Sequence, residues 1–247
     1  MTTATTLADV AAASLNAVRT LERYGLDYCC GGKQPFGEAC VAKGLQPESV
    51  MQEIERARAP GASERDWRMA PLDEIVTHIV GTHHEYLKLE LPALGSRMSK
   101  ALSVHGPKDP QTLGRLAEVF GSLRVELEMH MHKEEAILFP FLAQYGRAET
   151  LGQPLPPIPF GSIANPIGMM EREHESAGGA LAEIGEITHG FSYPPYACST
   201  VRALFDGLKA LKNDLHAHIH LENNILFPRA IALERREEPL FPDGQPQ

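Results

Sequence analysis

Apolar residues recur at helical spacing through four long segments, which cover roughly residues 72–103, 111–145, 165–189 and 197–235. Pro92 interrupts the first segment, and the proline- and glycine-rich loop GRAETLGQPLPPIPFGSIANP separates the second from the third. No run of alternating Val, Ile and Thr bounded by turn residues predicts a strand. Amphipathic helices of this length with modest connections favour an all-α, up-down four-helix bundle.

A shorter helical pattern precedes the bundle. Residues 5–24 predict one helix that ends before Gly25, LDYCCGGKQPFGEACVAKG predicts a turn and a short helix, and PESVMQEIERARA predicts a third helix with proline in its first turn. The stretch APGASERD is typical of a linker. We therefore predict a small helical N-terminal domain over residues 1–65, a bundle over residues 70–235 and a flexible tail over residues 236–247.

Composition narrows the classes of function. The 247-residue chain is 43% hydrophobic, and its formal net charge of −9 argues against a general nucleic-acid or acidic-membrane binder. No apolar run approaches the roughly 20 residues of a membrane span, and the first residues lack the basic and apolar regions of a signal peptide. Two of the four cysteines are adjacent, which is a poor spacing for a disulfide framework. We therefore expect a reduced, cytoplasmic protein.

One sequence frame occurs twice: HMHKEEAILFP at residues 130–140 and HIHLENNILFP at residues 218–228. Because residues four apart project from one helix face, His130 lies beside Glu134, and His218 lies beside Glu222. A histidine and a glutamate in an apolar core are costly unless they are paired or bind a metal. Both faces are expected to continue into the core, through Leu123, Leu127, Ile137, Leu138 and Phe141 in one copy and Leu211, Leu215, Ile225 and Leu226 in the other.

The second histidine of each frame serves as a comparison. His132 and His220 lie about 200° around the helix from the first histidine, which predicts solvent or a helix flank for both. His132 has Glu135 three residues later, but the second copy has Asn223 at that position. Since the carboxylate does not recur, we predict that this second combination lies at the surface.

Each copy also has a histidine on the preceding helix. His84 and His174 are 90 residues apart, close to the 88 residues between His130 and His218, and a glutamate follows each of them. Helical phase alone allows His83 in place of His84. Imidazole and carboxylate suit iron, manganese or zinc, and carboxylate-bridged two-metal centres in helix bundles use inward-facing groups of this kind. The predicted metal ligands are His84, His130, Glu134, His174, His218 and Glu222.

A coordination count indicates a reactive site. Two octahedral irons offer about 12 positions, of which four imidazoles, two bridging glutamates and an oxo or hydroxo bridge would fill about 10. About two positions would remain for small exogenous ligands. Glu126 and Asp214 stand one turn before His130 and His218, where they are either hydrogen-bond partners of the ligands or solvated helix charges.

The segments LDYCCGG, HMHKEEAILFP, EREHESAG and HIHLENNILFPRA resemble, in this order, the RIC family (repair of iron centres) of the hemerythrin-like superfamily. The resemblance implies a hemerythrin-like bundle with two iron ions that repairs iron–sulfur clusters damaged by nitric oxide or peroxide. It also implies that the family's ligands fall on the six positions above, with His84 rather than His83. Oxygen-carrying hemerythrin differs, because it has a second histidine where this chain has Gly178 and an aspartate on the fourth helix, where this chain has Glu222. This weighs against a reversible oxygen carrier.

The cysteines divide into two groups. Cys29 and Cys30 resemble the family's N-terminal motif, which implies thiols that are redox-active, bind iron in transit or contact the damaged cluster; alternatively, they only form a turn. A nearby lysine or helix N-terminus would lower the pKa of such a thiol. Cys40 and Cys198 are interpreted as ordinary helix residues.

The resemblance also implies partners, namely damaged iron–sulfur proteins and nitric oxide or another small diatomic ligand, and it leaves a homodimer open. Two other functions would use the same site residues. One is a nitric oxide reductase or peroxidase, and the other is a scavenger or sensor that binds nitric oxide or oxygen without turnover. The residues alone do not separate these functions.

Overall fold

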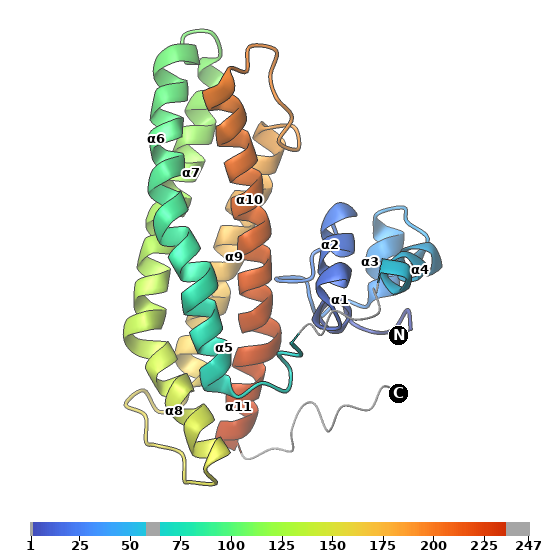
Figure 1. The fold of residues 1–247 in the computed structure, drawn as a ribbon, viewed down its shortest axis with the longest axis vertical. Helices are drawn as coiled ribbons and strands as arrows, with labels where there is room; N and C mark the ends of the chain where they lie inside the picture. The colour runs from blue at the N-terminus through green and yellow to red at the C-terminus, as the bar shows by residue number, and fades with distance from the viewer. Residues whose placement is uncertain (1, 58–64, 236–247) are drawn as a thin grey trace. The chain divides into compact units, whose positions relative to one another are not determined.

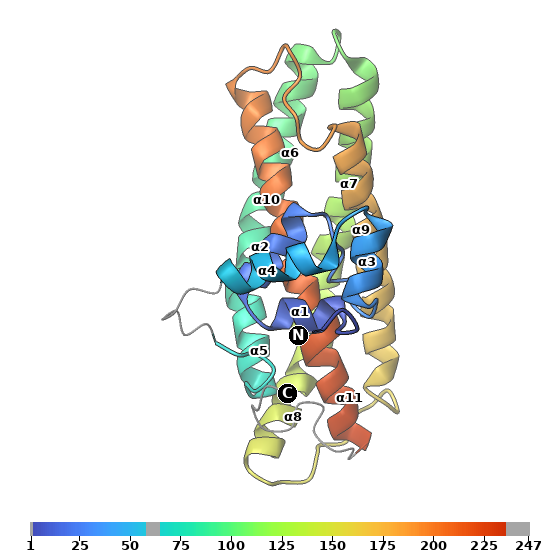
Figure 2. The same ribbon diagram turned by 90° about the vertical axis from the view of Figure 1, so that its right-hand side faces the viewer.

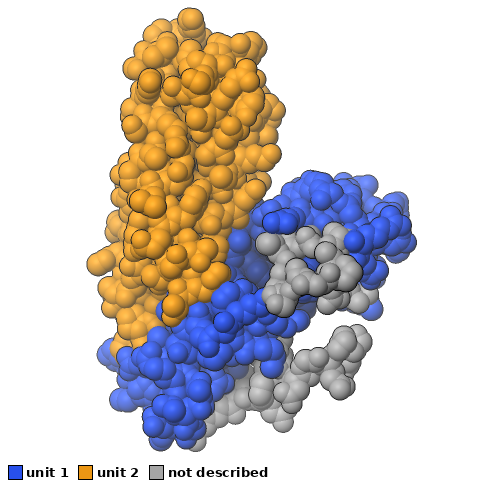
Figure 3. Space-filling view, in the orientation of Figure 1, with its two compact units in different colours: residues 1–76, 142–163, 216–247 blue, residues 77–141, 164–215 orange. Residues whose placement is uncertain are grey.

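A computed structural model describes residues 2–57 and 65–235, in which every regular element is a helix and a single β-bridge joins Thr6 to Pro35. This confirms the all-α fold. The chain forms two compact units (Figure 3): unit 1 comprises residues 1–76, 142–163 and 216–247, and unit 2 comprises residues 77–141 and 164–215. The predicted linker lies largely, and the predicted tail wholly, outside the described residues, so the predicted domain limits stay predictions.

Unit 2 is a bundle of long helices. It contains α6 (Glu85–His105), α7 (Pro110–Lys133), α9 (Ala164–Ile187) and the larger part of α10 (Ser199–Leu221). These four helices run side by side (Figures 1 and 2). Their shared core includes Leu91, Leu94, Leu116, Phe120, Leu123, Leu181, Ile184, Leu204, Phe205, Leu211 and Leu215. Each large apolar side chain buried there contributes about 1.5–3 kcal/mol to the stability of the fold.

Pro92 does not interrupt the first bundle helix, because α6 continues through it from Glu85 to His105. Proline removes one backbone hydrogen bond and crowds the preceding turn. Its neighbours Leu91 and Leu94 are fully buried in the bundle core, and this packing outweighs the local cost. The expected interruption at Pro92 was therefore wrong.

Three π-helical segments divide the long predicted helices. They are η1 (Ile79–His84), η2 (Glu134–Leu138) and η3 (Glu222–Leu226). They join α5 (Leu72–His78) to α6, α7 to α8 (Phe139–Thr150), and α10 to α11 (Phe227–Arg235). A π-helical turn contains one more residue than an α-helical turn and is most frequent at functional sites. Three of the predicted ligands, His84, Glu134 and Glu222, are the first or last residues of these segments.

Unit 1 contains the short helices that precede the bundle, α1 (Leu7–Ala12), α2 (Leu15–Arg23), α3 (Phe36–Ala42) and α4 (Pro47–Ala57). They share a core that includes Leu21, Tyr28, Phe36, Cys40 and Ile54. The predicted helix over residues 5–24 is two helices, because the Ser14 side chain accepts the backbone N–H of Ala17 and so starts α2. Gly25 has φ +63° and ends α2 as predicted, with the N–H of Gly25 donating to Glu22 and that of Leu26 donating to Leu21.

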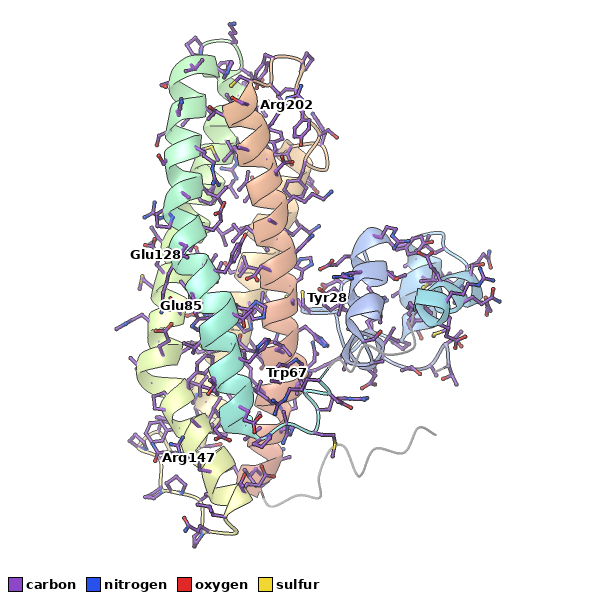
Figure 4. All side chains as sticks on the ribbon, viewed as in Figure 1. Tyr28, Trp67, Glu85, Glu128, Arg147 and Arg202 are labelled. Carbon is purple, nitrogen blue, oxygen red and sulfur yellow. The ribbon has the colours of Figure 1, made fainter. Side chains whose placement is uncertain are left out.

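Within unit 1, Asn224 of η3 binds the loop between α2 and α3. Its side-chain N–H donates to the backbone oxygens of Tyr28 at 3.1 Å and Cys29 at 3.3 Å. The Tyr28 ring also meets the rings of His216 and His220 edge-on, with centroids 6.1 and 5.5 Å apart, and Figure 4 labels Tyr28 in this loop. The Cys-Cys-Gly-Gly turn is thereby attached to the segment that carries the second sequence frame.

No helix in the described ranges is long and apolar enough to cross a membrane.

Candidate metal centre

Four of the six predicted ligands come together in the interior of unit 2. His84 ends η1, His130 lies in the last turn of α7, Glu134 begins η2, and His174 lies midway along α9. At most 3% of each side chain is exposed, and Glu134 and His84 are fully buried. Helical phase alone left His83 open, and the resemblance favoured His84; in the structure His84 Nε2 lies 3.4 Å from a carboxylate oxygen of Glu134.

The ring nitrogens of these histidines point at one another and at Glu134. His130 Nε2 lies 3.3 Å from the same Glu134 oxygen that His84 approaches, and His174 Nε2 lies 3.0 Å from His130 Nε2. Potential ligand atoms of His130, Glu134 and His174 all lie within 4.8 Å of one another. Groups at this spacing could hold one metal ion together.

The outward nitrogen of two histidines is held by a glutamate. His84 Nδ1 donates to Glu135 at 2.8 Å, and His130 Nδ1 donates to Glu173 at 2.8 Å. A lysine contacts each of these glutamates, Lys88 at Glu135 and Lys133 at Glu173. Such outer carboxylates fix the tautomer and orientation of metal-binding histidines.

Electrostatics keep both outer glutamates ionised. Burial favours the neutral acid, but hydrogen bonds from Lys88 and His84 outweigh it and lower the pKa of Glu135. The pKa of Glu173 is lowered in the same way by Lys133 and His130, against the effect of burial. An ionised carboxylate only accepts hydrogen bonds, so the proton of each neutral imidazole lies on Nδ1.

This proton assignment tests whether the pocket suits a metal. With Nδ1 protonated, a neutral His84 or His130 directs the Nε2 lone pair at the buried Glu134 carboxylate, which is repulsive unless positive charge lies between them. Two further protons or one cation would supply that charge. Only a cation serves the converging nitrogen and oxygen atoms together, and imidazole with carboxylate is a donor set that iron accepts. The residues therefore fit a metal ion.

The remaining two predicted ligands pair within unit 1. His218, in the last turn of α10, lies with Nε2 2.9 Å from Glu222 at the start of η3. Both side chains are buried, with 1% of His218 and none of Glu222 exposed. The one-turn spacing predicted from the second frame is therefore present.

Asp214 and Glu126, whose roles the sequence did not decide, have different surroundings in the structure. Asp214 accepts a hydrogen bond from His83 Nδ1 at 2.9 Å, so His83 is a buried, paired histidine. Glu126 is exposed and accepts the Ser176 hydroxyl at 3.2 Å. Glu135, predicted at the surface, is partly exposed, but its bond to His84 was not predicted, and Glu173 was not identified. A carboxylate outside a histidine ligand is a general feature of metal sites, but its position in the chain is not fixed by helical spacing.

The two flanking histidines behave differently. His132 is exposed as predicted, but His220 is buried, so that prediction was wrong. His220 lies edge-on to Tyr28 and its Nδ1 is 3.1 Å from the Asn224 amide nitrogen, and burial lowers its pKa to about 4. Ile137, predicted in the core, is 49% exposed, whereas the matching Ile225 is buried. His220 and Ile225 of the second frame are therefore buried, whereas the matching His132 and Ile137 of the first frame are exposed.

Cys29 and Cys30 form a compact group with Asp27 in unit 1. The Asp27 carboxylate accepts the backbone N–H of Cys29 at 3.1 Å and of Cys30 at 3.0 Å, and the two sulfur atoms are 3.8 Å apart. The pKa of Cys29 is raised by its hydrogen bond with Cys30, by burial and by Asp27. The anticipated lowering by a lysine or helix N-terminus therefore does not apply to Cys29. Cys40 lies within α3, as predicted, and is buried in the core, whereas Cys198 is exposed and directly precedes α10 instead of lying within it.

Comparison with known proteins places these features in a family. Residues 76–230 match the hemerythrin HHE cation binding domain, and residues 3–58 match a domain of unknown function, DUF542. The chain is 38% identical over 228 residues to proteins named iron–sulfur cluster repair protein YtfE from Citrobacter koseri, Escherichia coli and Shigella boydii. The alignments cover 92% of this chain and 97% of each relative.

This chain belongs to the YtfE family. The match covers both the N-terminal segment with its cysteine pair and the helices that carry the histidines, so the resemblance inferred from the motifs is confirmed. Membership in the YtfE family also agrees with the buried histidine and glutamate groups, which suit iron.

Proposed function

We propose that this chain is a non-haem di-iron protein that repairs iron–sulfur clusters damaged by nitrosative or oxidative stress. The observation that carries the proposal is the buried Glu134 carboxylate, which the Nε2 atoms of His84 and His130 approach at 3.4 and 3.3 Å. The relatives' shared name, iron–sulfur cluster repair protein, supports the biological role. A cytoplasmic location, where damaged clusters of other proteins are the substrate, is part of the same proposal.

The proposed ligands of two iron ions are the six residues predicted from the repeat, with Glu134 and Glu222 as bridging carboxylates. Helical phase supports the inclusion of the second pair. Leu211 and Leu215 of α10 lie in the core of the bundle, and His218 follows them by seven and three residues on the same helix. Residues at these intervals share one helix face. The six ligands are His84, His130, Glu134, His174, His218 and Glu222.

The protein groups would control the metals in three ways. Glu135 and Glu173 hold the protons of His84 and His130 on Nδ1, so that Nε2 remains a lone-pair donor. Complete burial of Glu134 excludes water from the donor atoms. Iron bound here would supply redox chemistry toward nitric oxide or another small diatomic ligand.

The cysteine pair is proposed to act on the damaged cluster or on iron in transit. Cys29 is 3% exposed and its raised pKa keeps it protonated at neutral pH, so Cys30, which is partly exposed, is the more accessible thiol. Thiolates are ligands for iron–sulfur clusters. The hydrogen bonds from Asn224 to the backbone of Tyr28 and Cys29 would hold this turn in place during such contact.

Metal analysis of the anaerobically purified chain tests the iron assignment. We expect about two irons per chain, and less than half of that in Glu134→Ala and Glu222→Ala, because each loses a buried carboxylate donor. Glu126→Ala is the matched control. Glu126 is exposed and accepts a hydrogen bond from the Ser176 hydroxyl, and it is not one of the proposed ligands. Unchanged iron in both buried variants would show that the ligand assignment is wrong.

Recovery of a nitrosylated iron–sulfur protein tests the repair role separately. The iron-loaded chain should restore the target's cluster absorption, and the Cys29→Ala/Cys30→Ala variant should lose this activity while it keeps its iron. Turnover of nitric oxide to nitrous oxide without cluster recovery would instead identify a nitric oxide reductase. Stoichiometric nitric oxide binding with neither activity would identify a scavenger.

A further inference from the structure

A cysteine and a buried histidine meet at the end of the bundle where α10 begins. Cys198 directly precedes Ser199, and its carbonyl accepts the first helical hydrogen bond, from Arg202. Its sulfur is exposed and lies 3.2 Å from Nε2 of His105, the last residue of α6. Arg202 is labelled in Figure 4, one turn into α10. None of these residues belongs to the proposed metal centre.

The helix start stabilises negative charge on this sulfur. Backbone N–H groups of Val201 and Thr200 donate to it, as first-turn amides donate to a capping side chain. The Val201 amide has the largest effect and His105 follows, and together they lower the pKa of Cys198 to about 7. At pH 7, about half of the molecules then carry Cys198 as a thiolate, compared with a few per cent for a free cysteine.

The buried imidazole has no other polar role that accounts for its place. His105 is 7% exposed, and its Nδ1 has no hydrogen-bond partner among the described residues. A buried N–H without an acceptor is rarer than a buried lone pair without a donor. The proton therefore belongs on Nε2, where it donates to the Cys198 sulfur, and this tautomer favours the thiolate over the thiol.

Two further residues hold His105 in position. Its ring stacks on Tyr196 with centroids 5.2 Å apart, and the Tyr196 hydroxyl donates to Asp109 at 2.7 Å. Asp109 also caps α7 by accepting the N–H of Thr112. Near the sulfur, Arg202 donates to the carbonyl of Ala197 at 3.3 Å. His105, Arg202, Tyr196 and Asp109 are the charged and titratable groups in these contacts.

We propose that Cys198 is a modification site at which a hydroperoxide and then a low-molecular-weight thiol react, with His105 as a positioning residue. The thiolate attacks the peroxide oxygen, the O–O bond breaks, and with one proton the products are cysteine sulfenic acid and an alcohol or water. Sulfur is oxidised by two electrons and the peroxide is reduced by two. The small thiol then displaces hydroxide, taken up with its proton as water, to give a mixed disulfide.

Unit 2 itself supplies no second thiol that could react with the sulfenic acid. Throughout unit 2, all of whose residues are described, Cys198 is the single cysteine. Cys29, Cys30 and Cys40 belong to unit 1, and Cys40 is fully buried. The modification would add a small polar group to the start of α10, and a disulfide within unit 2 has no second cysteine to form it.

Mass spectrometry of the full-length, iron-loaded protein tests the proposal. Treatment with hydrogen peroxide and glutathione should add one glutathione to the peptide that carries Cys198, and Cys198→Ser should remove this product. In His105→Gln we expect the reaction at pH 7 to slow about fivefold, and the midpoint of the pH profile of iodoacetamide alkylation to rise by about one unit. His189→Asn, a change at an exposed histidine of unit 2, is the matched control, with a profile close to that of the parent chain.

The buried Cys40 gives an internal reference, because it should stay unmodified in the same digest. The proposal is overturned if Cys198 alkylates with a midpoint at or above that of a free cysteine, or if His105→Gln leaves the midpoint unchanged. Iron content, measured on the same samples, should be equal in all variants. A change in iron would instead trace the effect to the metal centre, and would also contradict the proposal.

Discussion

Gly32 offers a sharp test of how the Cys-Cys-Gly-Gly turn is held in unit 1. A Cβ atom at this position would lie 2.7 Å from the backbone oxygen of Tyr28, 2.8 Å from the Asn224 side-chain oxygen and 3.1 Å from the Ala8 Cβ. The Gly32 carbonyl also accepts the N–H of Ala8 at 2.9 Å. Gly32→Ala therefore places a methyl group in space that is already occupied by the Tyr28 backbone, the Asn224 side chain and Ala8.

The expected cost follows from these distances. Ordinary contacts of a Cβ begin at 3.4 Å, so the Tyr28 oxygen and the Asn224 side chain must each move by about 0.6–0.7 Å. Overpacking of this kind costs about 1–3 kcal/mol. Displacing Asn224 also weakens its hydrogen bonds to Tyr28 and Cys29, at about 1 kcal/mol. We expect the free energy of unfolding of unit 1 to fall by about 2–4 kcal/mol.

Urea unfolding followed by tryptophan fluorescence measures this change, because the single tryptophan, Trp67, belongs to unit 1. Gly121→Ala is the matched control: Gly121 lies inside α7, and nothing is within 4 Å of its added Cβ. The free energy of unfolding of that variant should rise by about 0.5–1 kcal/mol, because alanine favours the helix over glycine. Urea unfolding followed by far-ultraviolet circular dichroism measures this change. The clash should also be smaller in an Asn224→Ala background. A Gly32→Ala protein within about 0.5 kcal/mol of the parent would refute the reasoning.

Two further predictions concern unit 2. Glu173→Gln should lower the affinity for iron about 10- to 100-fold in a chelator competition, because it weakens the hydrogen bond that fixes His130. Glu126→Gln, at an exposed glutamate, should leave the affinity unchanged. Equal affinities of the two variants would contradict the role given to Glu173. Leu94→Ala should cost about 2–5 kcal/mol in thermal or urea unfolding, and adding Gly207→Ala should recover part of that loss, since the Gly207 Cβ would otherwise meet Leu94 at 2.8 Å. A double variant no more stable than Leu94→Ala would show that the two positions do not share this space.

Periodicity in the sequence predicts the helices and the direction of the ligand faces well. His130 with Glu134 and His218 with Glu222 are one-turn pairs, so the α-helical repeat alone places each histidine beside its glutamate. The repeat also brings out His84 and His174, because the two halves have nearly equal spacing. These inferences succeed because they depend on local geometry within single helices.

Contacts between distant segments lie beyond such reasoning. Glu135 was assigned to the surface because its carboxylate is not repeated, yet it holds His84 from 51 residues away. His220 and Ile225 are buried while His132 and Ile137 are exposed, although the two frames are alike. Tyr28 lies against His220, and Asn224 donates a hydrogen bond to the same loop. An N-terminal segment therefore contacts the second frame, and the residues of the two frames alone do not predict this contact.

Each of the π-helical segments η1, η2 and η3 holds one residue more than an α-helical turn needs. Each residue of an α-helix turns it by about 100°, so a π-helical turn rotates every later side chain by about that angle relative to an unbroken helix. Deleting one residue from η2 would return it to α-helix, and the two rotations of about 100° would cancel, so that buried Leu142 and Tyr145 of α8 would keep their face. The added residue in η2 therefore serves the position of Glu134, and a one-residue deletion there would alter the candidate metal centre without disturbing the packing of α8.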